Sequence, residues 1–104
     1  MSNLDELNQL ITEVIRRAEE MEDVGSPYVK TAYAEVSRVE EKIAGVTEST
    51  SVEGMIARRG AVRAAIKADD PGRARLLADR FVIELDTVAQ SIPNWKDELR
   101  ALLP

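Results

Sequence analysis

The chain has 104 residues, carries a formal net charge of −5 and contains neither cysteine nor histidine. It therefore lacks a disulfide, a thiolate or imidazole nucleophile or base, and any Cys or His ligand for a metal. Because catalysis would rest on carboxylates, Lys, Tyr or Ser alone, we expect a protein that is not an enzyme, with no cofactor and no metal site.

The first six residues contain no cation and no apolar run, so no signal peptide is expected. No apolar stretch approaches the roughly 18 residues that span a bilayer. We expect a cytoplasmic protein that does not bind a membrane, folded as a single domain over residues 1–104. The chain stops abruptly at Pro104, which leaves open that it is the N-terminal domain of something longer.

A first helix is predicted over residues 4–23. Asn3 can cap it, and Glu6 follows three residues later in a capping-box arrangement. Apolar residues recur at steps of three and four, which is the spacing of one buried helix face. These residues are Leu4, Leu7, Ile11, Val14, Ala18 and Met21.

A second helix is predicted over residues 27–44, between two glycine stops. Gly25 can end the first helix, Ser26 can cap the second, and Pro27 suits the first helical position. Gly45 can end the second helix. The same apolar spacing recurs in Val29, Ala32, Val36, Val39, Ile43 and Val46.

A third helix is predicted over residues 51–68, where Thr50 and Glu53 form the next capping box. Its most regular stripe consists of small residues, which let another helix approach closely. The stripe is Gly54, Ala57, Ala61, Ala64 and Ala68.

A fourth helix is predicted over residues 71–91, capped by Asp70 and opened by Pro71. Pro93 separates it from a short fifth helix over residues 94–103. Because short connections favour antiparallel neighbours, the sequence predicts an all-α fold: an antiparallel up-down four-helix bundle with a short fifth C-terminal helix. The apolar seam of the fourth helix is Ala74, Ala78, Phe81, Leu85, Val88 and Ile92.

Half of the cations lie in one stretch, although the chain is acidic overall. On a helical projection of the third helix, Arg59, Arg63 and Lys67 share one line, and the hairpin would bring Arg73 and Arg80 near them. Such a cluster can bind an anionic ligand or phosphates. A solvated face of ion pairs is the alternative, and the acidic total argues against nucleic acid. The cations of the stretch are Arg58, Arg59, Arg63, Lys67, Arg73, Arg75 and Arg80.

Two aliphatic residues of the fourth helix lie away from its apolar seam. Leu76 and Ile83 are seven residues apart and are expected on the side opposite Phe81. Ile56, on the basic side of the third helix, is expected near the level of Ile83. Aliphatics framed by arginines predict a protein-contact surface, unless the C-terminal helix covers it. Its residues would be Ile56, Arg59, Arg63, Leu76, Arg80 and Ile83.

A third hypothesis rests on carboxylates. Glu19 and Glu20 with Asp23 include two acids on one helix face, which could serve a carboxylate–metal hydrolase. Such a site needs a second pair on the neighbouring helix, and Glu40 with Glu41 is expected at its far end. A solvated acidic face is therefore favoured.

The leading hypothesis is a small non-enzymatic interaction module: an adaptor, an assembly subunit or a regulator. It would bind another protein, or a second copy of itself as a homodimer, through the surface of the third and fourth helices. The main alternative is a binder of an anionic ligand or nucleic acid, and the remote one is the carboxylate–metal hydrolase. The residues of the anion-binding alternative are Arg59, Arg63, Lys67, Arg73 and Arg80.

Overall fold

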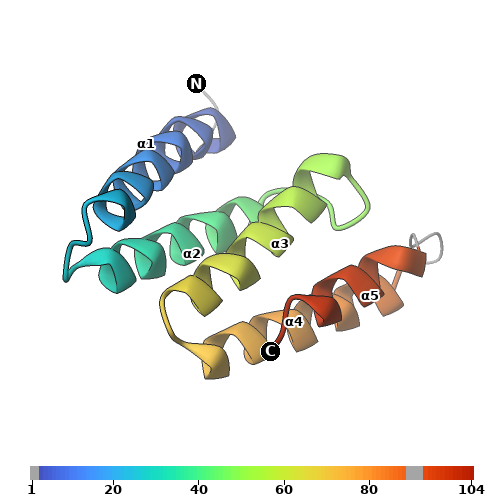
Figure 1. The fold of residues 1–104 in the computed structure, drawn as a ribbon. Helices are drawn as coiled ribbons and strands as arrows, with labels where there is room; N and C mark the ends of the chain where they lie inside the picture. The colour runs from blue at the N-terminus through green and yellow to red at the C-terminus, as the bar shows by residue number, and fades with distance from the viewer. Residues whose placement is uncertain (1–2, 89–92) are drawn as a thin grey trace.

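The computed structural model describes residues 3–88 and 93–104, and every regular element within them is a helix. The all-α class predicted from the sequence is confirmed. No helix in this described part of the chain is long and apolar enough to cross a membrane. The helices, shown in Figure 1, are α1 (Asn3–Asp23), α2 (Val29–Gly45), α3 (Val52–Lys67), α4 (Pro71–Asp86) and α5 (Pro93–Ala101).

Capping residues set two of the helix ends where the sequence predicts them. Gly25 follows α1 with a φ of +67°, and the Ser26 amide donates to the Met21 carbonyl at 2.9 Å. This is the hydrogen bond of a helix that ends on a left-handed glycine. At the start of α4, Asp70 Oδ1 accepts from the Arg73 amide at 3.1 Å. Local chemistry alone therefore determines both ends.

Two helices begin later than predicted. The cap of α3 is Ser51 rather than the preceding threonine, because the Gly54 amide donates to Ser51 Oγ at 2.9 Å. In the same way, α2 begins two residues after Pro27. There the Tyr28 amide donates to Ser26 Oγ at 3.1 Å, and this bond holds the segment as a turn.

The fourth helix is shorter than predicted. It ends at Asp86, where the Thr87 hydroxyl donates to the Glu84 carbonyl at 2.7 Å and satisfies an acceptor at the helix end. The prediction continued this helix to residue 91 and its apolar seam to Ile92. Residues 89–92 lie outside the described part of the chain.

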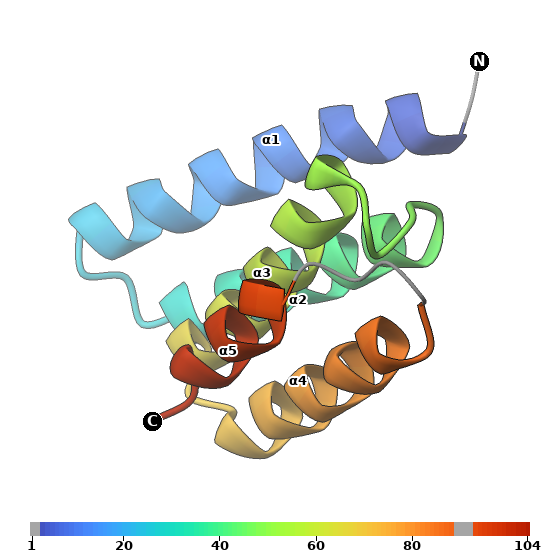
Figure 2. The same cartoon turned by 90° about the vertical axis from the view of Figure 1, so that its right-hand side faces the viewer.

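The helices pack in chain order. α2 lies between α1 and α3, and α3 also contacts α4 and α5. Figures 1 and 2 show α1 and α4 on opposite sides of the α2–α3 pair. The α1 backbone approaches neither α3 nor α4, so the α1–α4 contact that would close a four-helix ring is not made between these described helices.

The small residues of α3 face α2, as the stripe predicts. Ala61 and Ala64 are buried, and Ser37 of α2 donates its hydroxyl to the Ala61 carbonyl at 2.8 Å. At Gly54, a Cβ atom would collide with the backbone carbonyl of Glu48. The α2–α3 pair is therefore tightly packed, whereas the α1 backbone does not approach α3.

Arg58 is buried at the junction of three helices, although the sequence places it in the basic stretch. Its side chain is 3% exposed, and it donates to the carbonyls of Ala44 at 2.9 Å and Thr47 at 3.2 Å. It also pairs with Glu84 of α4 at 3.1 Å and lies 5.6 Å from the centre of the Phe81 ring. Arg58 thus satisfies free carbonyls at the end of α2 and belongs to the interior of the fold.

Candidate functional site

The predicted basic cluster is divided among ion pairs that face different helices. Arg73 and Arg80 both pair with Glu41 of α2, each at 2.7 Å. Arg59 pairs with Glu98 of α5 at 3.3 Å, and Lys67 with Glu22 of α1 at 3.7 Å. Arg63 is exposed and has no ion pair among the described residues. The structure does not gather these cations on one surface, which agrees with the alternative of a face of ion pairs.

The predicted apolar surface is also divided. Leu76 and Ile83 are 68% and 62% exposed on the outer side of α4, because α3 packs on the opposite, buried side of that helix. Ile56 is 58% exposed but lines a cavity together with Ile11 and Ile15 of α1. Ile56 therefore faces α1 rather than the outer side of α4, although the Arg58–Glu84 pair sets it near the level of Ile83 along the hairpin, as expected.

The C-terminal helix leaves the outer face of α4 uncovered. Leu99 of α5 is fully buried, and Trp95 packs against the same core, where α5 contacts α3 and α4 (Figure 2). Because Leu76 and Ile83 remain exposed, the alternative in which the C-terminal helix covers them is wrong.

Two adjoining cavities occupy the space between α1 and α3, with α2 as their floor. Their volumes are about 320 and 400 Å³, and Ile15 of α1 and Glu40 of α2 line both of them. We call the two together the α1–α3 groove. It is the candidate functional site, because it combines an apolar part, a charged part and a buried acid.

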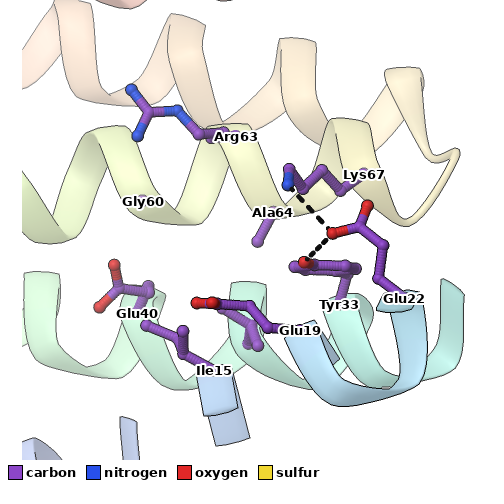
Figure 3. Close-up of a pocket in the computed structure, with 10 residues that line it drawn as sticks. Ile15, Glu19, Glu22, Tyr33, Glu40, Gly60, Arg63, Ala64 and Lys67 are labelled. Atoms are coloured by element: carbon purple, nitrogen blue, oxygen red, sulfur yellow. Dashed lines mark hydrogen bonds and ion pairs between the residues drawn. The ribbon is translucent and has the colours of Figure 1, made fainter. Parts of the chain in front are cut away.

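The two parts of the α1–α3 groove differ in chemistry. One cavity is lined mainly by aliphatic side chains, namely Ile11, Ile15, Ile43 and Ile56, with Ala57. The other, shown in Figure 3, is lined by charged and polar side chains, namely Glu19, Glu22, Tyr33, Glu40, Arg63 and Lys67. The groove is therefore amphipathic along its length, with Glu40 at the boundary.

Glu40 is the unusual residue of this groove. It is 8% exposed, and it has no hydrogen-bond or ion-pair partner among the described residues. Burial raises the pKa of its carboxyl group to about 7 because the charged form is poorly solvated there. Its carboxyl lies against Gly60 of α3, where a Cβ atom would overlap it.

A cluster of three side chains closes the charged end of the groove, as the dashed lines of Figure 3 show. Tyr33 donates its hydroxyl to Glu22 at 2.9 Å, and Lys67 pairs with the same carboxylate. Burial, the hydrogen bond to Glu22 and nearby negative charge raise the pKa of Tyr33 to about 12. This cluster ties α1 to α2 and α3 and is internally satisfied.

The arrangement of the carboxylates bears on the metal-site hypothesis. No group of three or more acidic side chains in residues 3–88 and 93–104 is arranged to hold a metal ion. Glu40 lies toward the far end of α2, as expected, and it lines the same cavity as Glu19.

Sequence reasoning misses Glu40 as a site residue, although a signal is present. Val36, Glu40 and Ile43 continue the four-three step of the buried face of α2. An acid at such a position has to be buried or has to line a cavity.

Comparison of the chain with protein-family models, with curated proteins and with solved structures gives no match, so the function of the site is inferred from its own residues.

Proposed function

We propose that this protein is a non-enzymatic interaction module, a single domain of antiparallel helices in up-down order, which binds a partner protein in the α1–α3 groove. The observation that supports this proposal is the groove itself. Its two cavities meet at Ile15 and Glu40 and form one amphipathic depression over α2. The absence of cysteine fits a reducing compartment, and we propose the cytoplasm.

The shape of the groove favours an elongated occupant. On α1 the lining extends from Asn8 to Glu22, and on α3 from Glu53 to Lys67. At 1.5 Å per residue each stretch is about 21 Å long, or about four helical turns. An amphipathic helix buries its apolar face in such a groove through side chains at i, i+3, i+4 and i+7. The proposed occupant is therefore an amphipathic helical segment of another protein.

A matched pair of isoleucines tests this proposal. Ile56 lines the groove and Ile83 lies on the outer face of α4, and the two are similarly exposed. The probe is a capped 16-residue helical peptide with one leucine stripe and a single arginine within it. We expect Ile56→Gln to weaken its binding about tenfold, since one anchored aliphatic contact is lost, and Ile83→Gln to leave it unchanged. Isothermal titration calorimetry measures both.

The outcomes separate the two surfaces. Equal binding by wild type and Ile56→Gln would contradict the groove. Weakening by Ile83→Gln alone would instead favour the outer face of α4, with Leu76 beside it, as the partner surface.

The outer face of α4 supports a second candidate site for the same function. Leu76 and Ile83 remain exposed on a helix whose other side is well buried. The partner there would be another protein or a second copy. If Leu76→Asp with Ile83→Asp changes neither the mass by light scattering, at low and high salt, nor peptide binding, this face is not an interface.

The charge pattern gives less support to the other hypotheses. Four of the five cations proposed for an anionic ligand or nucleic acid already have carboxylate partners: Arg59, Lys67, Arg73 and Arg80. Retention on a phosphate resin that is lost on charge reversal of Arg59 and Arg63 would revive that proposal. Stabilisation by Mg²⁺ or Mn²⁺ would likewise revive a carboxylate–metal hydrolase.

A further inference from the structure

Glu40 is a buried carboxyl that the fold leaves without a partner. Its carboxyl lies against Gly60, and it lines a cavity with Ile15, Val36 and Arg63 without pairing to any of them. A buried acid is normally paired or hydrogen-bonded, because a lone charge loses its hydration. Here the carboxyl lines the open groove that we propose as the partner site, so a partner can supply what the chain does not.

We propose that Glu40 receives a basic side chain, lysine or arginine, from the partner segment bound in the α1–α3 groove. This inference rests on the proposed function and adds the chemistry of recognition. The basic head group would bond to the Glu40 carboxylate, while aliphatic residues of the same segment would lie on Ile11 and Ile56. A charge-assisted hydrogen bond in a partly dry groove is stronger than one at the surface.

The other charged groups of the groove favour a cation at this position. α1 contributes Glu19 and Glu22, α2 contributes Tyr33, and α3 contributes Glu53, Arg63 and Lys67. Lys67 is already paired with Glu22, and Arg63, which lies on the α3 side of the cavity in Figure 3, makes no ion pair with Glu40. Glu19 and Glu40 are thus left as negative groups without a cation of their own in the described structure.

Gly60 opens the wall of the groove beside Glu40. Because a Cβ atom at this position would overlap the carboxyl group, any other residue would displace it. Glycine in the middle of a helix is unfavourable by about 1 kcal/mol relative to alanine. Its presence here allows the acid to sit deep between α2 and α3 and still face the groove.

This arrangement makes the recognition depend on pH. Because the pKa of Glu40 is raised to about 7, the free protein holds this carboxyl mostly neutral at pH 5.5 and mostly charged at pH 8.5. A cation binds the charged form. Binding of a basic segment should therefore strengthen as the pH rises through 7.

Two peptides that differ at one residue test the inference. The probes are the capped 16-residue leucine-stripe peptide with its single arginine and the same peptide with glutamine there. In wild type at pH 8.5 we expect the arginine peptide to bind about tenfold more tightly. At pH 5.5, and in Glu40→Gln at both pH values, the two peptides should bind alike. Glu13→Gln, which removes an acid of α1 outside the groove, should keep the tenfold preference.

The outcomes distinguish this inference from the proposed function. If both peptides bind equally at pH 8.5 and Ile56→Gln weakens both, the groove stands and the role of Glu40 is overturned. If the preference survives in Glu40→Gln, another acid carries it and the inference is wrong. If neither peptide binds wild type, the groove proposal and this inference fail together.

Discussion

Glu40 and Glu41 are adjacent on α2, yet their carboxyl groups meet opposite environments. Glu41 accepts hydrogen bonds from Arg73 and Arg80 of α4, each at 2.7 Å, while Glu40 faces α3 and the groove without a partner in the described structure. Burial raises the pKa of Glu41, but the hydrogen bonds and charges of the two arginines outweigh it and leave that pKa below its usual value. Glu41 therefore links α2 to α4, whereas Glu40 is available to bind a cation of a partner.

Removing the charge of Glu40 should stabilise the protein at high pH. Its folded-state pKa of about 7 lies above the ordinary 4.5, so the charged form opposes folding, progressively above pH 4.5 and fully above pH 7. We expect Glu40→Gln to raise the free energy of unfolding by about 1–2 kcal/mol at pH 8, since water in the groove screens part of the effect. Urea unfolding at pH 4 and pH 8 measures it, and an equal effect at both would contradict the account.

The same substitution at the neighbouring position should act in the opposite direction. The lowered pKa of Glu41 means that its charge stabilises the fold above pH 4.5 and that this contribution is lost as the pH falls. Glu41→Gln should lower the free energy of unfolding by about 1 kcal/mol at pH 8, because the ion pairs are partly exposed. The loss should shrink toward pH 3. A stabilising Glu41→Gln would show that the Arg73 and Arg80 pairs do not form.

A methyl group at Gly60 should displace Glu40 without unfolding the chain. The overlap is with the flexible end of the Glu40 side chain, which can move, whereas at Gly54 it is with the Glu48 backbone, which cannot. We expect Gly60→Ala to change stability by less than about 1 kcal/mol and Gly54→Ala to lose about 2 kcal/mol or more. Carbon-detected NMR titration should show the Glu40 pKa falling from about 7 toward its ordinary value in Gly60→Ala. An unchanged pKa would mean that the contact with Gly60 does not hold the carboxyl in place.

Two consecutive arginines should differ sharply in their effect on stability. Arg58 is buried and satisfies carbonyls at the end of α2, whereas Arg59 makes a single, partly exposed pair with Glu98. Arg58→Met should cost about 2–4 kcal/mol, because it leaves buried acceptors and Glu84 without their donor. Arg59→Met should cost less than about 0.5 kcal/mol. Thermal melts of the two variants test this, and similar losses would place Arg58 at the surface.

Most of the helical order follows from short-range chemistry, which is why sequence predicts it. Gly25 and Asp70 act on backbone groups within a few residues of themselves. The apolar step that predicts Phe81 and Leu85 as core residues is likewise local, and both are buried. Where a neighbouring side chain competes for the cap, as at Ser51, the boundary moves by one residue.

The site depends on contacts between helices, and the spacing of apolar residues along the sequence does not reveal those contacts. Glu40 becomes a buried, unpaired acid only because α3 places Gly60 opposite it and α1 stands apart from α3. The basic stretch is misleading for the same reason: its charge is visible in the sequence, but the partners Glu41 and Glu98 come from other helices. Pairing across helices therefore decides which charges are available for a ligand.

The most direct test of the α1–α3 groove is a methyl NMR spectrum of isoleucine-labelled protein titrated with the arginine-containing peptide. The account predicts shift changes at the groove residues, with Ile83 of α4 unaffected. Changes at Ile83 without changes in the groove would contradict it, and so would a spectrum that does not respond to the peptide. The groove isoleucines are Ile11, Ile15, Ile43 and Ile56.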